Sequence, residues 1–197
     1  KYGLTETYGG DPYQLVRDGK WTVDTAFEAA QLLKNDLNAD GILNYMDEFG
    51  WAGQKDDMWY IFFGSGERIT GADSDGYPII TVYNERSSKV IEKLQEFVQG
   101  EGYYVSANDF FSVTTWPTEL TRGAFIEGRS LFFNDSVGTV ALLGEMEQRF
   151  GVIPEPKFEA KQEGYHSLVN PWGSTCFAIP VNVVGEELTM TIDALNV

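Results

Sequence analysis

The sequence predicts an α/β fold in which helices and strands alternate around one core. Segments with helical and with strand-like hydrophobic patterns follow one another along all 197 residues, without an internal repeat, a low-complexity tract or an obvious linker. Hydrophobic residues make up 43% of the chain and aromatic residues 14%, which is enough for a substantial core. We therefore expect residues 1–197 to form one α/β domain, with a calcium-loop insertion at about residues 36–48.

The first helix is expected to follow a loop. Residues 1–20 are polar and rich in glycine, which favours irregular structure. Thr22 can then cap a helix, and Asp24 lies in its first turn, where a negative charge is favourable. The apolar face of this helix would be formed by Phe27, Ala30, Leu32 and Leu33. A second, short helix is predicted at about residues 45–51.

The middle of the chain contains one ambiguous segment and one clear hairpin signal. Residues 58–63 are apolar throughout, so their periodicity fits a buried strand or a buried helix. Residues 68–72 and 78–83 flank the sequence DSDG, in which Asp75-Gly76 predicts the turn of a β-hairpin.

Helical spacing and capping residues predict the elements of the second half. Asn84 can cap a helix that runs to about Gln99 and ends at Gly100. The elements expected beyond it are a helix at 118–127, a strand at 129–133, a helix capped by the sequence NDS at 134–136 and ending near 149, and short strands at 151–154 and 175–180.

The composition excludes several classes of function. The formal net charge of −16 argues against binding to nucleic acid and against docking on an anionic membrane surface. With one cysteine, Cys176, and one histidine, His166, an internal disulfide cannot form, and neither a zinc site nor a Cys–His nucleophile is expected. No apolar run approaches the roughly 18 residues that span a bilayer. Because the sequence begins with Lys1, we expect it to be part of a longer protein.

The sequence DLNADGILNYMD at residues 36–47 has the pattern of a calcium-binding loop. Such loops place oxygen ligands at alternating positions, a glycine at the sharp turn and a carboxylate at the end. Gly41 occupies the position of the turn. The expected ligands are Asp36, Asn38, Asp40, the carbonyl of Ile42, and Asp47.

An aspartate in the last ligand position is similar to the dockerin-type variant of this loop, but dockerins carry two loops and this chain has one. We therefore expect Ca²⁺ to be a structural cofactor that holds the second predicted helix, at about residues 45–51, to the first. Extracellular calcium modules bind with dissociation constants of about 10⁻⁴–10⁻³ M, which suits a site outside the cell. The alternative is a turn rich in Asn and Asp that never binds calcium.

Four segments together resemble the extracellular solute-binding proteins of carbohydrate ABC transporters, the family 1 group that includes maltose-binding protein. The segments are GKWTVD at 19–24, DLNADG at 36–41, FIEGRSLFF at 125–133, and the run from ME at 146–147 through FGVIPEPK at 150–157. The resemblance covers residues 12–182 and is closest to the second lobe of a two-lobed periplasmic-binding-protein type II fold.

The resemblance implies two α/β lobes joined by a hinge, with a sugar in the cleft between them. It implies an oligosaccharide ligand, ABC transporter permease subunits as partners, and an extracytoplasmic location, either secreted, lipid-anchored or periplasmic. A monomer without catalytic activity is expected. The comparison also favours a helix over residues 57–64.

Sugars are bound by aromatic platforms combined with planar polar side chains. Of the five tryptophans, Trp21 and Trp59 are expected in the core. Trp51, Trp116 and Trp172 are flanked by Gly, Pro or Thr, as loop aromatics are, and for these three a cleft position and a core position remain alternatives.

The resemblance adds polar candidates to the ligand site. It places Gln54 and Asp56 at the cleft, and Asp135 at a strand-to-helix turn where the family often has a stacking tryptophan. Val137 follows here instead, so stacking at that turn is in doubt. For the neighbouring Asn134 and Ser136, simple helix capping is the alternative.

Two other classes of function compete with sugar binding. A glycosidase needs two carboxylates about 5–10 Å apart in a cleft, and with 30 acidic residues such a pair would be unremarkable. A dockerin-like, calcium-dependent interaction module would require two loops and a small helical domain. A non-sugar solute is a third alternative, because one architecture can carry many ligands.

Overall fold

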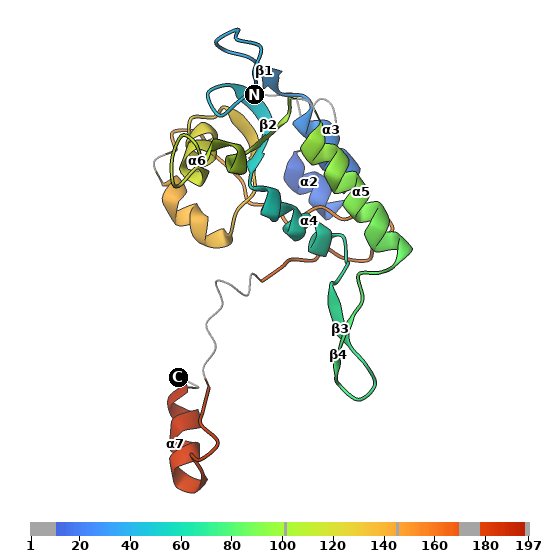
Figure 1. The fold of residues 1–197 in the computed structure, drawn as a ribbon, viewed down its shortest axis with the longest axis vertical. Helices are drawn as coiled ribbons and strands as arrows, with labels where there is room; N and C mark the ends of the chain where they lie inside the picture. The colour runs from blue at the N-terminus through green and yellow to red at the C-terminus, as the bar shows by residue number, and fades with distance from the viewer. Residues whose placement is uncertain (1–10, 101, 145, 170–177, 196–197) are drawn as a thin grey trace.

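The computed structural model describes residues 11–100, 102–144, 146–169 and 178–195, and it shows a mixed α/β architecture built on small sheets (Figure 1). The larger sheet has four strands: β1 (Lys34–Asn35), β2 (Glu48–Gly53), β5 (Tyr104–Ser106) and β6 (Ser130–Phe133). Strand β2 is central. It pairs in parallel with β5 on one side and with β6 on the other, and β1 pairs antiparallel with its beginning.

Helices cover both faces of this sheet. On one face, Trp51 of β2 packs against Phe27 of α3 (Val23–Ala30) and Phe97 of α5 (Glu85–Gln99). On the other face, Phe49 and Ala52 of β2 pack with Val105 of β5 and with Ala124 of α6 (Thr118–Ile126). Figure 1 shows α6 on one side of β2 and α3 and α5 on the other. The parallel strands are therefore buried between two helical layers.

The beginning of the described chain is helical where a loop was expected. Helix α2 (Pro12–Arg17) begins after Asp11, whose carboxylate accepts the amide hydrogen of Gln14 at 2.8 Å. Because Pro12 occupies the first helical position, the cap and the proline together define a helix start that the glycine-rich composition obscures. The helix predicted after Thr22 is confirmed as α3, with the Thr22 hydroxyl accepting from the Thr25 amide at 3.3 Å.

The short helix predicted at 45–51 is wrong, because residues 48–53 form β2, the central strand of the sheet, which is buried from Phe49 to Gly53. Gly50 shows why this segment is extended. A β-carbon there would lie 1.8 Å from the carbonyl oxygen of Ala30, so β2 passes directly against the end of α3. Pairing with three other strands and this backbone contact override the local pattern. Trp51 is accordingly a strand residue and not a loop aromatic.

The ambiguous apolar run is a helix, α4 (Met58–Gly64), preceded by the 3₁₀ helix η1 (Lys55–Asp57). Ile61 and Phe62 have no exposed surface, whereas Trp59 is 45% exposed. The expectation that Trp59 lies in the core is therefore wrong, because the helix turns this residue to the outside.

The predicted hairpin is confirmed as β3 (Thr70–Ala72) and β4 (Pro78–Ile80). In its turn, the carboxylate of Asp73 accepts the amide hydrogens of Asp75 at 3.0 Å and Tyr77 at 2.8 Å. Both strands are exposed along their whole length, and Figure 1 shows the hairpin projecting from the body below α4 and α5.

The helix predicted after Asn84 is confirmed as α5, and the Asn84 side chain accepts the Ser87 amide hydrogen at 2.9 Å. Lys93 of α5 forms an ion pair with Asp24 of α3, which ties the two helices of this layer together. The helix and strand expected at 118–127 and 129–133 are likewise confirmed as α6 and β6.

The segment after β6 differs from the expectation. Instead of a helix that ends near residue 149, a 3₁₀ helix, η3 (Val137–Leu143), ends before Gly144, and Ser136 makes no capping hydrogen bond with its side chain. Residues 151–154 form no strand. The strand expected at 175–180 lies partly outside the described residues, and residues 178–180 are not in a strand.

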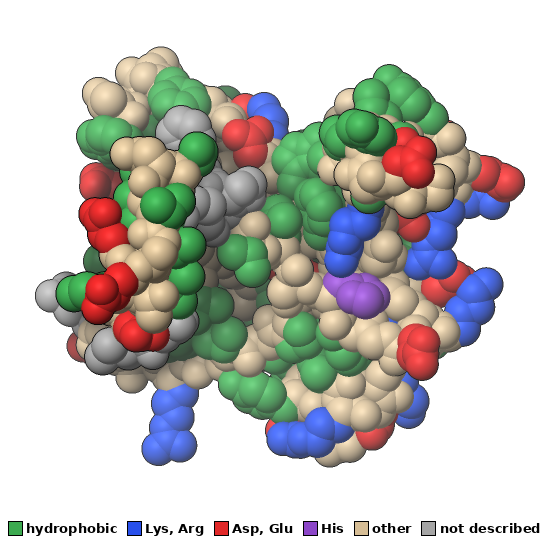
Figure 2. Space-filling view, turned by 90° about the horizontal axis from the view of Figure 1, so that it is seen from below, with side chains coloured by type: hydrophobic (Ala, Val, Ile, Leu, Met, Phe, Trp, Pro, Cys, Tyr) green, Lys and Arg blue, Asp and Glu red, His purple; other side chains and the backbone are tan. Residues whose placement is uncertain are grey.

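The last described element is α7 (Gly185–Leu195), which the sequence patterns did not single out. It contains no buried residue, and Figure 1 shows it apart from the rest of the fold. Figure 2, which looks from the end where α7 and the hairpin lie, shows hydrophobic and acidic side chains side by side on this surface. None of the helices in the described part of the chain has the length and apolarity needed to cross a bilayer.

Candidate ligand-binding cleft

The three parallel strands end at one edge of the sheet, and polar residues follow each of them. Gln54 and Asp57 follow β2, Asn108 follows β5, and Asn134 and Asp135 follow β6. In open α/β sheets ligands bind beside the carboxyl ends of the strands, at the place where neighbouring connections leave in opposite directions. Strand β2 lies between β5 and β6, so this edge is such a place.

Hydrogen bonds tie the three strand ends together. The carboxylate of Asp57 accepts the amide hydrogen of Gln54 at 2.6 Å, which closes the turn after β2. The side chain of Asn134 donates to the carbonyl of Asp57 at 3.2 Å. The amide of Lys55 donates to the side chain of Asn108 at 2.8 Å. Hydrogen bonds therefore hold the segments that follow β2, β5 and β6 in fixed positions relative to one another.

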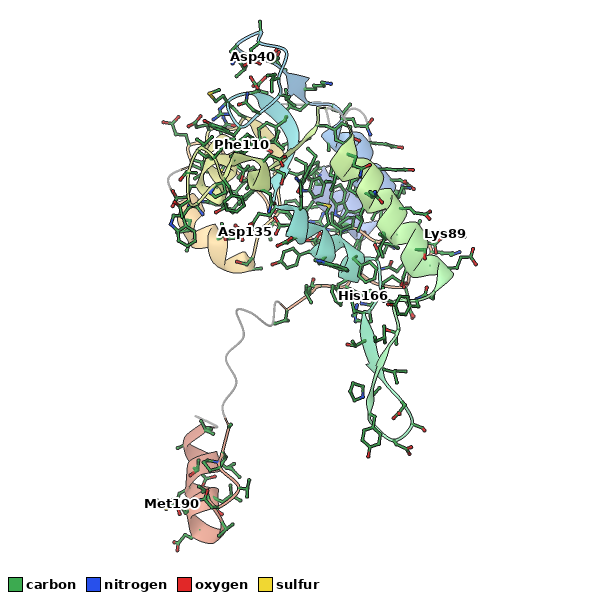
Figure 3. All side chains as sticks on the ribbon, in the orientation of Figure 1. Asp40, Lys89, Phe110, Asp135, His166 and Met190 are labelled. Carbon is green, nitrogen blue, oxygen red and sulfur yellow. The ribbon has the colours of Figure 1, made fainter. Side chains whose placement is uncertain are left out.

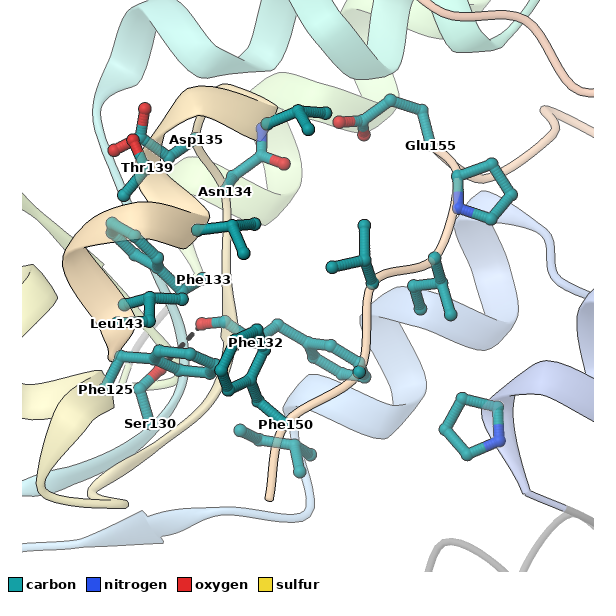
Figure 4. A pocket seen from close by; sticks show the side chains of 18 of the residues that line it. Phe125, Ser130, Phe132, Phe133, Asn134, Asp135, Thr139, Leu143, Phe150 and Glu155 are labelled. Carbon is teal, nitrogen blue, oxygen red and sulfur yellow. Dashed lines mark hydrogen bonds between the residues drawn. The ribbon is translucent and has the colours of Figure 1, made fainter. Parts of the chain in front are cut away.

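A cleft of about 820 Å³ lies between β6 and η3 on one side and residues 148–156 on the other. Aromatic residues from several elements contribute to its walls: Tyr13, Trp21, Trp51, Tyr60, Phe125, Phe132, Phe133 and Phe150. Figure 4 shows the labelled phenylalanines, Phe150 among them, towards one end and Asn134, Asp135 and Glu155 towards the other. The cleft thus has an aromatic end and a polar end.

The outer wall is held in place by backbone contacts with the first helices. The indole of Trp21 donates to the carbonyl of Pro154 at 3.0 Å, and the amide of Lys157 donates to the carbonyl of Trp21 at 3.1 Å. The amide of Val152 donates to the hydroxyl of Tyr13 at 3.1 Å. The segment of residues 151–157 therefore follows α2 and the start of α3 although it forms no regular strand.

Glu155 in the cleft wall and Asp57, a buried residue that does not line the cleft, both have raised pKa values. Burial, with the nearby charges of Asp135 and Asp56, raises the pKa of Asp57 to about 7, although the hydrogen bond from Gln54 acts in the opposite direction. Burial and the charge of Asp57 raise the pKa of Glu155 to about 8. Burial is the main cause of both shifts, because a low-dielectric environment disfavours the ionised form of a carboxyl group.

Two buried hydrogen-bond donors close to the cleft have no acceptor. Trp51 forms part of the cleft wall, is 3% exposed, and its indole N–H has no partner in the described structure. The hydroxyl of Tyr104, opposite Trp51 on β5, is also buried without a partner, and burial and the charge of Asp57 raise its pKa. Unsatisfied buried donors are rare, and neither of these two donor atoms has accessible surface that faces the cleft.

The residues expected at a sugar site are brought together only in part. Trp51 and Asp135 line the cleft, and Gln54 and Asp56 lie at the adjoining end of β2. Trp116 is 69% exposed in the loop before α6 and is not part of the cleft wall.

Trp172 lies outside the described residues. The capping alternative for Asn134 does not hold, because its side chain instead donates to the carbonyl of Asp57.

Sequence reasoning missed Glu155 and the phenylalanines of β6. The signal for Phe132 and Phe133 was present, because both lie in the predicted strand that leads into Asn134 and Asp135. No local pattern identifies Glu155, which reaches the cleft because residues 154–157 are held beside Trp21.

The candidate calcium loop lies at the opposite end of β2 from the cleft. It runs into the beginning of β2, whereas Asp135 adjoins the strand's carboxyl end, and Figure 3 shows Asp40 and Asp135 at separate places along the molecule. Strand β2 has six residues and spans about 20 Å. Arg129, just before β6, donates to the carbonyls of Tyr45 and Asp47 and anchors the loop.

Within the loop, the candidate ligands accept hydrogen bonds from backbone amides. The two oxygens of Asp36 accept from Ala39 at 2.7 Å and from Gly41 at 2.8 Å. Asp47 is fully buried, and its oxygens accept from Leu37 at 3.0 Å and Asn44 at 2.9 Å.

The side chain of Asp40 accepts from the Ile42 amide at 2.7 Å and from the Asn38 side chain at 2.9 Å. The donor set consists of oxygens only and fits calcium by chemistry. In the part of the chain that is described, however, no three Asp, Glu, His or Cys residues are grouped to hold a metal ion.

The chain was compared with protein-family models, with curated proteins and with solved structures, and none of them matches it.

Proposed function

We propose that this chain is a sugar-binding lobe of an extracytoplasmic solute-binding protein, which delivers an oligosaccharide to the permease subunits of an ABC transporter. The observation that carries the proposal is the aromatic cleft beside the carboxyl edge of the parallel strands, with Asn134, Asp135 and Glu155 at its polar end. Closure of such a lobe on a second lobe around the sugar would be what the transporter detects.

The chemistry of the cleft suits a saccharide. Aromatic rings such as Phe150 and Phe132 offer flat apolar surfaces for the C–H faces of a sugar ring. The carboxylate of Asp135 and the amide of Asn134 can accept hydrogen bonds from the hydroxyl groups of a sugar.

Calcium is proposed as a structural ion of the 36–47 loop, with Asp36, Asn38, Asp40, the Ile42 carbonyl and Asp47 as ligands. Bound there, it would hold the loop against the start of β2 and take no part in sugar binding.

The direct test is calorimetric titration of the chain with a panel of oligosaccharides in calcium-containing buffer. We expect saturable binding to one sugar class. Phe150→Ala should weaken it about 2- to 10-fold, because one aromatic contact contributes about 0.5–1.5 kcal/mol. Phe111→Ala is the matched control, since Phe111 is exposed and does not line the cleft. A folded chain that binds no member of the panel would overturn the proposal in favour of a non-sugar solute or a calcium-dependent interaction module.

One observation favours a second candidate function. A retaining or inverting glycosidase needs a carboxylic acid with a raised pKa near a second carboxylate. Glu155 has such a pKa, and Asp135 lines the same cleft. Release of chromophore from a nitrophenyl glycoside, abolished in Glu155→Gln, would establish catalysis. We propose binding without turnover, so no release is expected.

A further inference from the structure

The two ends of the cleft offer different side chains to a ligand (Figure 4). The apolar end is formed by Phe125, Phe132, Phe133 and Phe150. Phenylalanine has an apolar ring and, unlike tyrosine and tryptophan, no side-chain group that forms a conventional hydrogen bond. Asn134 and Asp135 lie towards the other end, where they supply hydrogen-bonding oxygens. The cleft therefore separates apolar contacts from polar contacts.

Polar side chains near the apolar end are hydrogen-bonded within the chain. The hydroxyl of Ser130 donates to the carbonyl of Phe132 at 2.7 Å, which Figure 4 marks with a dashed line. The indole N–H of Trp21 and the hydroxyl of Tyr13 bond to the backbone of residues 151–157, at 3.0 and 3.1 Å. A sugar hydroxyl placed on the phenylalanines would exchange water for an apolar ring, which is unfavourable.

Two longer polar side chains, those of Gln148 and Arg149, line the cleft just before Phe150 in the sequence. Both residues are exposed. Long polar side chains can cover apolar surface with their stems and keep their polar ends in water. Their presence is therefore compatible with an apolar site below them.

The rings of the apolar end are held in place by other aromatic residues. Phe133 stacks on Phe125 with ring centroids 5.4 Å apart. Phe132 lies against Trp21 and Trp51, with centroids 5.5 and 5.1 Å apart. Strand β6 pairs with β2 alone, so side chains from both of its faces can reach the cleft at its free edge. The apolar surface is thus formed before a ligand binds.

The polar end contains a buried side chain with an acceptor that is not used. Asn134 is 9% exposed, and its amide nitrogen donates to the carbonyl of Asp57 at 3.2 Å. In the described part of the chain, no donor bonds to its side-chain oxygen, and this atom keeps accessible surface, in contrast to the indole N–H of Trp51. One oxygen of Asp135 accepts from the Ser136 amide at 2.6 Å, which leaves the other for a ligand. Hydroxyl groups are suitable donors to both residues.

One compact ligand can contact both ends at once. Phe132 and Asp135 are three residues apart, so their α-carbons are separated by at most about 10 Å. The cleft volume of about 820 Å³ is within the usual range for small-molecule sites. A ligand that is polar along its whole length would place hydroxyl groups on the phenylalanines, whereas a ligand with one polar and one apolar part would match both ends.

We propose that the cleft recognises a glycoside with an apolar aglycone. The sugar hydroxyls bond to Asn134 and Asp135, and the aglycone packs on the phenylalanines of the apolar end. The inference rests on the proposed function and narrows its ligand from oligosaccharides in general to saccharides that carry an apolar group. Burial of the aglycone adds affinity, and the hydroxyl contacts fix the orientation of the ligand.

The experiment compares matched pairs of glycosides that differ only in the aglycone. Methyl and phenyl glycosides of glucose, galactose and mannose, in both anomeric forms, are titrated calorimetrically into the chain in calcium-containing buffer. Phenol is the probe for the apolar group without a sugar. We expect the phenyl glycoside of at least one sugar to bind at least about tenfold more tightly than its methyl counterpart, because the phenyl ring leaves water. Phenol alone should bind more weakly than that phenyl glycoside.

Two variants test the assignment of the ends. Phe150→Ala should weaken binding of the phenyl glycoside about 2- to 10-fold and leave the methyl glycoside, which does not reach Phe150, unchanged. Asp135→Asn should weaken both glycosides by the same factor, because it acts on the sugar. Phe111→Ala, at an exposed position outside the cleft, is the control that should change neither.

The outcomes distinguish this inference from the proposed function. If methyl and phenyl glycosides bind equally, or if unsubstituted oligosaccharides bind while the glycosides do not, the inference is wrong and the proposed function stands. If neither glycosides nor oligosaccharides bind to the folded chain, or if phenol binds as tightly as the phenyl glycoside, both are wrong. The methyl–phenyl comparison uses the unmodified chain, so it does not depend on the folding of a variant.

Discussion

At the scale of single residues, the raised pKa values of Asp57 and Glu155 predict that the stability of the fold depends on pH. Asp57 and Glu155 are held where their ionised forms are unfavourable, and burial is the main cause for both. A carboxyl whose pKa is raised by folding binds its proton more tightly in the folded chain than in the unfolded one. Its contribution to stability is therefore present at low pH and is lost as the pH rises.

The first prediction concerns this loss. The free energy of unfolding should fall between about pH 4, the pKa of an unfolded carboxyl, and pH 7–8, where Asp57 and Glu155 ionise in the fold. The slope is up to about 1.4 kcal/mol per pH unit for each proton. Asp57→Asn should flatten it, because asparagine can still accept the Gln54 amide hydrogen and carries no charge.

Urea denaturation at pH 5, 6, 7 and 8 measures this slope. Glu92→Gln is the control, since an exposed carboxyl should leave the slope unchanged. Equal slopes for Asp57→Asn and the unmodified chain would show that Asp57 does not titrate in this interval.

At the scale of elements, local signals defined helix starts and turns, whereas long-range packing defined strands and burial. Thr22 and Asn84 cap α3 and α5 as their sequences predicted, because a cap depends on residues a few positions apart. Strand β2 was missed, since its conformation depends on partners far away in the chain. Trp51 and Trp59 differ in burial for the same reason: packing of distant helices decides which tryptophan faces inward.

The second prediction tests the contact between α3 and β2. Gly50→Ala should destabilise the fold by about 1–3 kcal/mol or more, because the new methyl group would overlap the backbone at Ala30. Gly123→Ala is the matched control, because Gly123 lies inside α6 with open space around its α-carbon. That change should stabilise the helix by about 0.5–1 kcal/mol. Thermal melting of the two variants should therefore shift in opposite directions, and a shared direction would contradict the close packing.

The third prediction concerns the 36–47 loop. With a dissociation constant of about 10⁻⁴–10⁻³ M, 10 mM calcium should stabilise the chain by about 1.4–2.7 kcal/mol relative to EDTA. Asp36→Asn should remove most of this difference. Asp73→Asn, in the hairpin turn, is the control that should leave it intact. An identical melting temperature in calcium and EDTA would mean that the loop is held by its own amide hydrogen bonds alone.

At the scale of the whole molecule, the 36–47 loop and the cleft lie at opposite ends of β2. Because they are separated, we expect the two candidate sites to act independently. Calcium would act on stability, and the cleft would act on ligand binding. A sugar titration in EDTA, below the melting temperature, should therefore give the same affinity as one in calcium. A large loss of affinity in EDTA would show that the loop and the cleft are coupled.

The sequence predicted the α/β class, the hairpin, three helices and β6. It also predicted candidate ligand-binding residues around Gln54 and Asp135. The cleft itself could not be predicted from the sequence. That feature requires residues 154–157 to lie beside Trp21, a contact between positions more than a hundred residues apart that no local pattern encodes. Glu155 enters the candidate site only through this contact.

The most direct test of saccharide binding in the cleft uses the indole N–H resonances of the five tryptophans. In a ¹H–¹⁵N NMR titration with oligosaccharide, we expect the Trp51 resonance, assigned with Trp51→Phe, to shift saturably because Trp51 forms part of the cleft wall. The resonances of Trp59 and Trp116, which are exposed and do not line the cleft, should remain in place. A Trp51 resonance that stays unchanged at saturating concentrations of every oligosaccharide would contradict the account.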